Sequence, residues 1–379
     1  MVMEHGYRFK PLSALLFMIM FFLCISNIIA GVLVDKVSDA GSSTCNPSGE
    51  YNAISTYNHN KPDQGFLDGS FVFKPEDITL SDDGFHGSDS LFYTEWWYFD
   101  ATLNSNYSIQ MIINAFGLFN SNLVLVKLNL YRYGDLIISR EKVYLSRFFS
   151  ASSDEPRVLL DGEEAMRGYI ADGVWVYNVN ISIDDVSVSL VYTGVNKGWK
   201  GAVLVGDWVV ALPKAYVSGE VVVDDTVIHV EGVGYHDHNY DLNWRMFLVF
   251  GWYWGKIHTS NYTLTWSYQM KDTRLDKAPL LVINQGAEDY ISIDPGFIEF
   301  TMRNYTLHYG YIIPGSVTLK ANTENISVLI NMDVLDAHHM NVFLFKYTRF
   351  HMRCKGYIRV NDHTEVFNQV EITELFRFR

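Results

Sequence analysis

Alternation between apolar and polar residues is the feature of this sequence that most restricts its fold. In the segment Tyr262–Met270 every second residue is apolar, and threonine, serine and glutamine residues fill the positions between them. Successive side chains of a β-strand point to opposite faces, so this period of two predicts a half-buried strand. Helical periodicity is almost absent elsewhere, and we expect an all-β protein. The apolar set consists of Tyr262, Leu264, Trp266, Tyr268 and Met270.

Turn signals divide the rest of the chain into short strands. Residues 219–232 predict a hairpin that turns at Asp224-Asp225, and residues 174–192 predict another around Asp184-Asp185. A short helical turn is expected at residues 161–166. The number of strands fits two antiparallel β-barrels better than one, and closing a sheet removes its exposed edges. Further strands are expected at residues 124–131, 297–302, 326–332, 342–350 and 366–375.

An uncharged apolar run at residues 12–34 follows Arg8 and Lys10 near the N-terminus. A bilayer-spanning helix needs about 20 apolar residues, whereas the apolar region of a signal peptide is shorter. The length favours a retained hydrophobic anchor helix within residues 1–34, while the small pair Ala30-Gly31 keeps cleavage of a signal peptide open. Basic residues stay on the cytoplasmic side, so we expect the body outside the cytoplasm, either membrane-anchored or secreted, after a polar linker at residues 35–65.

Two further features agree with export. Of the three cysteines, one lies in the apolar run, and Cys45 and Cys354 could form a disulfide in an oxidising compartment. Five Asn-x-Ser/Thr sequons predict a glycoprotein. Their asparagines are Asn106, Asn180, Asn261, Asn304 and Asn325.

The charge balance excludes whole classes of partner. The chain has 29 Lys and Arg residues and 43 Asp and Glu residues, which gives a net charge of −14. Nucleic-acid binding needs a basic surface, and so does docking on anionic lipids, so the N-terminal segment is the only expected membrane contact. Aromatic residues make up 15% of the chain, which suits the wall of an apolar cavity. We therefore expect a hydrophobic small molecule as the partner, and the oligomeric state is left open.

Glu95 begins an unusual aromatic run, Glu95-Trp96-Trp97-Tyr98. In a strand, Glu95 and Trp97 face one way while Trp96 and Tyr98 face the other. If the Glu95 face lines a barrel interior, apolar surroundings raise its pKa toward the range of a general acid. Alternatively, Glu95 pairs with an arginine or caps a backbone turn.

The densest polar stretch, at residues 234–244, begins Gly-Tyr-His-Asp-His-Asn. Asp237 or His238 could transfer a proton. His236 and His238 face the same side of a strand, as two metal ligands would, but no third ligand is identifiable and we expect no metal. The remaining interpretation is structural, with Asp237 and Asn239 hydrogen-bonded to backbone groups where the chain leaves the first barrel.

Three motifs together resemble the AttH and carotenoid 1,2-hydratase (hydroxyneurosporene synthase) family. The resemblance implies two lipocalin-like antiparallel β-barrel domains in tandem, at residues 66–240 and 241–379. The family includes hydratases of carotenoids and of plant products such as kievitone, fungal Diels–Alderases, and proteins proposed to carry lipids. Tyr240-Asp241 stands where the family commonly has Trp-Gly. The motifs are Glu95-Trp96-Trp97-Tyr98, Gly-Val-Gly-Tyr-His-Asp-His-Asn at residues 232–239, and Trp252-Tyr253-Trp254-Gly255.

Two functions remain open from the sequence. The first is extracytoplasmic binding or carriage of a lipid- or isoprenoid-like ligand in a barrel cavity. The second is a hydratase or isomerase acting on an isoprenoid-type alkene, in which Asp237, His238 or Glu95 donates a proton and aromatic faces stabilise the cation. Neither needs a cofactor, and the sequence has no glycine-rich phosphate loop and no Gly-x-Ser-x-Gly nucleophile elbow. The expected ligand contacts are Trp96, Trp97, Tyr98, Tyr235, Asn239, Trp252, Tyr253 and Trp254.

Overall fold

A computed structural model of the chain describes residues 73–377, except 89, 91, 119–120, 244–248, 271–276, 288, 309 and 343–344. The predicted anchor or signal segment, the linker and Cys45 lie outside these residues. Within them, no helix combines the length and the hydropathy needed to cross a bilayer. The described residues lie in one compact unit.

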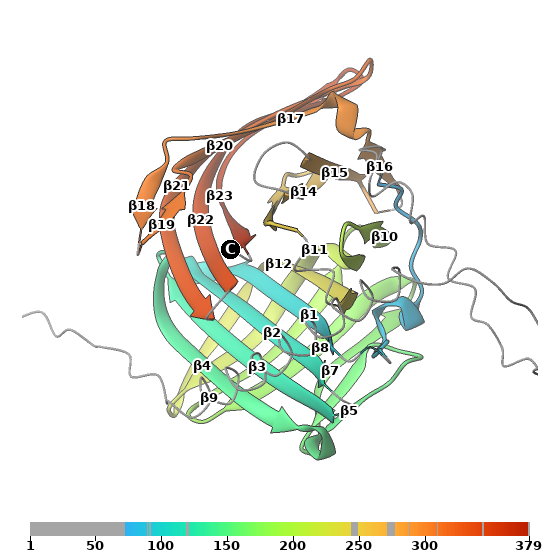
Figure 1. The fold of residues 1–379 in the computed structure, drawn as a ribbon, viewed down its shortest axis with the longest axis vertical. Helices are drawn as coiled ribbons and strands as arrows, with labels where there is room; N and C mark the ends of the chain where they lie inside the picture. The colour runs from blue at the N-terminus through green and yellow to red at the C-terminus, as the bar shows by residue number, and fades with distance from the viewer. Residues whose placement is uncertain are drawn as a thin grey trace, which may run out of the picture. The chain divides into compact units, whose positions relative to one another are not determined.

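The first sheet ends at Asn243 and curls into a nearly closed antiparallel barrel, coloured blue to yellow in Figure 1. A short 3-10 helix, η1 (Leu80–Asp83), precedes it. The strands are β1 (Phe92–Leu103), β2 (Tyr107–Leu118), β3 (Ser121–Arg132), β4 (Asp135–Leu145), β5 (Phe149–Ala151), β6 (Arg157–Leu160), β7 (Glu163–Ala171), β8 (Val174–Ile183), β9 (Val186–Gly194), β10 (Trp199–Val203), β11 (Gly206–Val223) and β12 (Thr226–Asn243). Their order is β4-β3-β2-β1-β12-β11-β9-β8-β7-β6-β5, and β10 pairs with β11.

The second sheet begins at Gly251 and forms the other nearly closed antiparallel barrel, coloured yellow to red in Figure 1. Its order is β16-β15-β14-β13-β23-β22-β21-β20-β17, and β18 and β19 form a separate hairpin. The strands are β13 (Gly251–His258), β14 (Tyr262–Met270), β15 (Lys277–Gln285), β16 (Asp289–Ile293), β17 (Ile298–Arg303), β18 (Thr306–His308), β19 (Tyr311–Ile313), β20 (Ser316–Asn322), β21 (Ile326–Val342), β22 (Phe345–Val360) and β23 (His363–Arg377).

The prediction of an all-β protein with two barrels is confirmed. Each barrel is filled by its own apolar core, one contributed by the strands before Asn243 and the other by those after Gly251. The two predicted hairpins are present as β8–β9 and β11–β12. Asp184 and Asp224 turn them with positive φ angles of 53° and 42°, a conformation that Asp tolerates better than most residues.

Two local predictions are wrong. Residues 161–166 form no helical turn, because the chain turns at Asp161, with a φ of 55°, and enters strand β7 at Glu163. Residues 342–350 are not one strand, because β21 ends at Val342 and β22 begins at Phe345, where those two residues pair. The apolar pattern continues through that turn, so alternation alone could not mark it.

Strand β14 is buried on both faces rather than on one. Its apolar side chains belong to the core of the second barrel, as predicted. The polar side chains between them are buried too, because they face the first barrel. Thr263 Oγ1 donates to Asn196 Oδ1 at 2.7 Å, and Gln269 Oε1 accepts from the backbone N–H of Leu204 at 2.9 Å. In the sequence, a polar strand face that packs against another barrel shows the same alternation as a face exposed to solvent. The alternation therefore could not predict the second buried face of β14.

The features that suggested export are partly visible. The asparagines of all five sequons are exposed, and glycosylation itself stays a prediction. Cys354 is a buried free thiol whose Sγ lies 3.6 Å from the carbonyl oxygen of Met352. Cys354 thus forms no disulfide within the described residues, and its pairing with Cys45, which lies outside them, stays a prediction.

The two barrels meet in a layer of buried side chains, which we call the inter-barrel layer. Its apolar part is a mainly aromatic cluster drawn from both sheets. Its polar contacts include Tyr98 to Glu374 and Lys256 to Asp100, each joining a residue of the first sheet to one of the second. The cluster consists of Phe73, Tyr98, Trp199, Trp208, Val210, Tyr235, Trp254, Leu280 and Val282.

Candidate active site

Strands β1 and β12 pair side by side and carry polar groups on both of their faces. Trp97 lies opposite His238 and Tyr98 opposite Asp237 in the ladder. Because neighbouring side chains of a strand point to opposite faces, His238 enters the first barrel while Asp237 enters the inter-barrel layer. Asp237 and His238 are neighbours in the sequence, but their side chains lie in separate environments.

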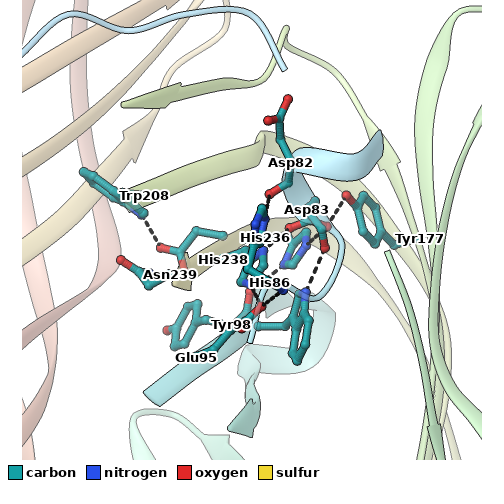
Figure 2. A network of polar contacts seen from close by, with 12 residues as sticks. Asp82, Asp83, His86, Glu95, Tyr98, Tyr177, Trp208, His236, His238 and Asn239 are labelled. Atoms are coloured by element: carbon teal, nitrogen blue, oxygen red, sulfur yellow. Dashed lines mark hydrogen bonds and ion pairs between the residues drawn. The ribbon is translucent and has the colours of Figure 1, made fainter. Parts of the chain in front are cut away.

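Inside the first barrel, four fully buried side chains form a network that we call the His–carboxylate network (Figure 2). His236 Nε2 lies 3.0 Å from Asp83 Oδ2. His238 Nδ1 lies 3.3 Å from Asp83 Oδ1, and His238 Nε2 lies 2.9 Å from Glu95 Oε1. The four groups thus alternate in the order His236, Asp83, His238 and Glu95, away from water.

The same network fixes the segment around η1 to the barrel. Glu95 accepts hydrogen bonds from the backbone N–H groups of His86 and Gly87, at 2.9 and 2.8 Å. Trp97 Nε1 donates to the backbone oxygen of Asp83 at 2.9 Å. The interpretation of Glu95 as a cap for backbone groups is the one that the structure shows.

The groups of the His–carboxylate network stabilise one another's charged forms. Burial alone would raise the pKa of Asp83, but the adjacent His236 and His238 outweigh it and hold that pKa well below its usual value. Burial alone would lower the pKa of His238, but Asp83 and Glu95 raise it to about 9. His238 is therefore an imidazolium at neutral pH, paired on both sides. Within the described residues, no group of three or more His, Cys, Asp or Glu side chains is arranged to hold a metal ion.

On the opposite face of β12, Asp237 is buried in the inter-barrel layer and bonded to other side chains. Its Oδ2 accepts from Trp208 Nε1 at 2.9 Å and from the Tyr235 hydroxyl at 2.8 Å. Asn239 Nδ2 lies 3.4 Å from Oδ1. Figure 2 shows Trp208 and Asn239 on the side away from Tyr177. Among the residues that the structure describes, Asp237 forms no side-chain hydrogen bond to a backbone group, because it lies within β12 rather than where the chain leaves the sheet.

The pKa of Asp237 is raised to about 6, because burial penalises its charge more than the hydrogen bonds from Trp208 and Tyr235 stabilise it. A carboxyl with this pKa exchanges protons readily near neutral pH. His238 and Asp237 therefore differ in kind, since the first keeps its proton and the second can release it.

A chain of polar contacts continues from this region across the two sheets. Lys256 Nζ lies 2.6 Å from Asp100 Oδ2. The Tyr98 hydroxyl lies 2.9 Å from Asp100 Oδ2 and 2.8 Å from Glu374 Oε1. The Tyr347 hydroxyl donates to Glu374 Oε1 at 2.6 Å. Burial raises the pKa of Glu374 to about 7, against these hydrogen bonds, so a second carboxyl of the layer titrates near neutrality.

The predicted ligand contacts divide between three places. Trp97 lies in the core of the first barrel and Tyr253 in the core of the second. The other six share the side where the barrels meet: Trp96, Tyr98, Tyr235, Asn239, Trp252 and Trp254. Ring centres in this layer lie 5.0 Å apart for Tyr235 and Trp254, and 5.5 Å apart for Tyr98 and Trp254.

Several residues of these networks were missed from the sequence. Asp83 stands outside every motif, and Glu374 and Tyr347 come from strands near the C-terminus. Two of the missed residues do carry a signal. Asp100 shares the parity of Tyr98 in β1, and Lys256 shares that of Trp254 in β13, so strand parity would have placed both in the layer.

The fold is similar to those of solved structures. One is a protein provisionally named AttH from Nitrosomonas europaea, 13% identical with a TM-score of 0.60, covering 79% of this chain and 96% of that one. Another is CghA with Sch210972, 8% identical with a TM-score of 0.53, covering 76% of this chain and 89% of that one. At the level of fold, these likenesses confirm the predicted resemblance to AttH.

Kievitone hydratase from Nectria haematococca also matches, at 12% identity and a TM-score of 0.49, covering 79% of this chain and 92% of that one. No family model and no curated protein matches the sequence.

Proposed function

We propose that the chain binds an apolar small molecule of lipid or isoprenoid type in the inter-barrel layer, and that Asp237 exchanges a proton with an alkene of that molecule. The observation that carries the proposal is Asp237 itself, a buried carboxyl with a pKa of about 6 beside aromatic rings from both barrels. A carboxyl that titrates near the working pH can serve as acid and as base. The proposed activity is that of a cofactor-independent hydratase or isomerase.

The proton returns to Asp237 in either reaction. The carboxyl protonates one alkene carbon, the π electrons form the new C–H bond, and the other carbon becomes a cation. In a hydratase, water adds to the cation and gives a proton back to the carboxylate. In an isomerase, the carboxylate removes a proton from a neighbouring carbon and a shifted double bond forms. The carboxylate that the transfer leaves on Asp237 stabilises the cation electrostatically, because the faces of Tyr235 and Trp254 already hold Lys256 Nζ, at 5.1 and 4.9 Å from the ring centres.

The inter-barrel layer is favoured over a cavity inside either lipocalin-like barrel. Buried apolar side chains pack the interior of the second barrel, and in the first barrel they surround the His–carboxylate network, whose four groups contact one another. The layer instead combines aromatic surface with a few converging polar groups, which is the composition of small-molecule sites. The structure of CghA with Sch210972 gives one case in which a similar fold holds a small molecule.

Carriage of the ligand without turnover is the second candidate, because the same aromatic cluster would hold an unreactive lipid. One experiment separates the two. Purified full-length chain is examined by native mass spectrometry for a co-purifying ligand, which is then incubated with fresh protein in D2O. The enzyme proposal predicts a product with deuterium on carbon. Recovery of the unchanged ligand after long incubation would leave carriage as the function.

Substituting Asp237→Asn tests the role of the carboxyl. Asparagine keeps the shape but has no acidic proton, so turnover is expected to fall at least about 100-fold, the contribution typical of a general acid. Ligand affinity should change little. The matched control is Asp172→Asn, an exposed turn residue with a φ of 51° that asparagine also adopts. A variant Asp237→Asn with wild-type turnover would remove Asp237 from the mechanism.

The proposed role of Asp237 as a general acid also predicts how kcat/KM depends on pH. The acid form of Asp237 predominates below its pKa of about 6, so kcat/KM is expected to be highest there and to fall about tenfold for each pH unit above it. Initial rates between pH 5 and pH 8, under buffers of constant ionic strength, measure the profile. A rate that rises through this range would assign the proton transfer to a base instead.

We also propose that the body lies outside the cytoplasm, with residues 1–34 as a signal peptide or membrane anchor. The apolar run at residues 12–34 supports this placement. Sequencing the N-terminus of the mature protein decides between the alternatives. A start near Gly31 would exclude a retained helix, and an intact N-terminus would exclude cleavage.

A further inference from the structure

The inter-barrel layer contains a buried cation without a hydrogen-bond partner. Arg349, on β22, is fully buried. None of its three side-chain nitrogens, Nε, Nη1 and Nη2, forms a hydrogen bond with any described residue. Its guanidinium lies over the face of Tyr131 on β3, whose ring centre lies 3.8 Å from Cζ. A guanidinium carries five N–H donors and keeps its charge at all physiological pH values, so burial without partners is costly.

The carboxyl of Glu374 lies beside Arg349 in the β22–β23 ladder but forms no ion pair with it. Glu374 Oε1 is occupied by Tyr98, Tyr347 and Gln110 instead. The pKa of Glu374 is also raised to about 7 by burial, so near neutral pH a large fraction of its carboxyls carry no charge. Arg349 therefore forms no ion pair with any described residue.

A second unsatisfied group lies on the same face of the strand. His351, two residues further along β22, is buried and packs 5.4 Å from the Tyr131 ring. Its Nε2 lies 3.1 Å from Ser108 Oγ, and its Nδ1 has no hydrogen-bond partner among the described residues. When the Ser108 hydroxyl donates to Nε2, Nδ1 carries the ring proton and is a free donor. Burial and the charge of Arg349 lower the pKa of His351 to about 3, so this imidazole is neutral.

We propose that Arg349 receives the carboxylate of an amphipathic ligand, with His351 as a neutral second donor. The ligand is thus an apolar chain or ring system that carries one carboxylate, a fatty acid or an isoprenoid acid. This inference rests on the proposed binding of an apolar molecule in the inter-barrel layer and adds the chemical class of that molecule.

A single buried guanidinium without an ion pair favours a carboxylate over a phosphate. Two other buried cations are already paired, Lys256 with Asp100 at 2.6 Å and Lys127 with Glu141 at 3.8 Å. One positive charge without an ion pair matches a monoanion, whereas a phosphate monoester brings about two negative charges at neutral pH. The planar fork of a guanidinium also matches the two oxygens of a carboxylate. Asp336, opposite His351 in the ladder, is engaged with His338 at 3.3 Å.

The test compares laurate with methyl laurate, two saturated probes that differ in charge and cannot be hydrated. Binding to the full-length protein is followed through tryptophan fluorescence, since Trp208 and Trp254 lie in the layer. The wild type is expected to bind laurate about 10 to 100 times more tightly than the ester, the value of a charged hydrogen-bonded contact. Arg349→Met should bind both probes equally, with the wild-type affinity for the ester. Arg349→Lys keeps the charge and should retain part of the preference.

Each outcome decides the proposal. Equal affinity of the wild type for the two probes, or an unchanged preference in Arg349→Met, would overturn the carboxylate site while leaving apolar binding intact. If neither probe binds, the proposed function fails, and the anion site is judged with hexanoate alone. A rise in the wild-type Tm with hexanoate that is absent in Arg349→Met would then support the site. No rise in the wild type would overturn it.

Discussion

At the scale of single residues, the alternation of side chains along β12 places the adjacent residues Asp237 and His238 in different electrostatic environments. Asp237 and His238 differ by one position, so they face different layers. Asp237 receives neutral donors, and its pKa rises to about 6. His238 lies between two carboxylates, and its pKa rises to about 9. This difference supports the proposed proton exchange by Asp237, whereas His238 and Glu95 hold each other and the segment around η1 in place.

The charge on His238 makes stability depend on pH. Its pKa is about 9 in the folded chain and about 6.5 in an unfolded one, so its stabilisation is complete below pH 6.5 and is lost as the pH rises toward 9. The free energy of unfolding is expected to fall by about 3 kcal/mol over that range. In His238→Gln, this slope should disappear, and the protein should be less stable at pH 7.

Denaturant titrations at pH 7, 8 and 9 measure the effect. The control is His229→Gln, because His229 is 79% exposed at its side chain and should leave the slope unchanged. A slope that persists in His238→Gln would show that other groups cause it.

The functional residues could be predicted from the sequence only where they lie close together in one motif. Asp237, His238 and Glu95 were found because they stand in dense motifs, and parity correctly separated Glu95 from Tyr98. The contact between Tyr98 and Glu374 joins residues 276 positions apart, and no local sequence pattern predicts it. Asp83 reaches the His–carboxylate network from a 3-10 helix, which period-two alternation does not detect.

At the scale of elements, β12 is packed so closely against its neighbours that a side chain at Gly234 would clash with them. A Cβ built on Gly234 would lie 2.6 Å from the backbone oxygen of Asp100 and 2.6 Å from a carbon of Tyr192. Gly234→Ala is therefore expected to lower the free energy of unfolding by about 1–3 kcal/mol, the cost of overpacking. Chemical denaturation measures it.

A second glycine gives the control for that prediction. Gly173 lies in an open turn with a φ of 79°, where asparagine is tolerated and no atom lies within 4 Å of a built Cβ. Gly173→Asn should change the free energy of unfolding by less than about 0.5 kcal/mol. Equal effects of the two substitutions would contradict the tight packing around β12.

Strands and hairpins were predictable where turn chemistry interrupts the alternation. The aspartate pairs at the turns of β8–β9 and β11–β12 marked both hairpins. The β21–β22 turn was missed because apolar residues continue through it. The second buried face of β14 was also missed, because threonine, serine and glutamine look solvated until another sheet is seen to cover them.

At the scale of the whole molecule, buried ion pairing couples the two barrels. Lys256 and Asp100 lie on different sheets and are almost fully buried. Removing one partner leaves the other charge unpaired in the layer, which costs about 3–5 kcal/mol. Lys256→Met should therefore lower the stability of the full chain by that amount. The double variant Asp100→Asn with Lys256→Met should recover most of it, as a double-mutant cycle by denaturation would show. Additive losses would mean that the pair is not coupled.

Two barrels were predictable from the strand pattern, but their packing was not. The alternation predicts which side chains share a face of each sheet. It does not say whether a polar face meets water or another barrel, and the inter-barrel layer is made of two such faces. The proposed chemistry resides there, so the site became visible only when the two sheets were seen together.

The central claim is that the ligand lies in the inter-barrel layer beside Asp237 rather than inside a barrel. A crystal structure of the full-length protein with laurate bound tests it most directly. The account predicts ligand density between β12 and β13, with the carboxylate at Arg349 and the chain against Tyr235 and Trp254. Density enclosed by the core residues of either barrel, with the inter-barrel layer unchanged, would contradict it.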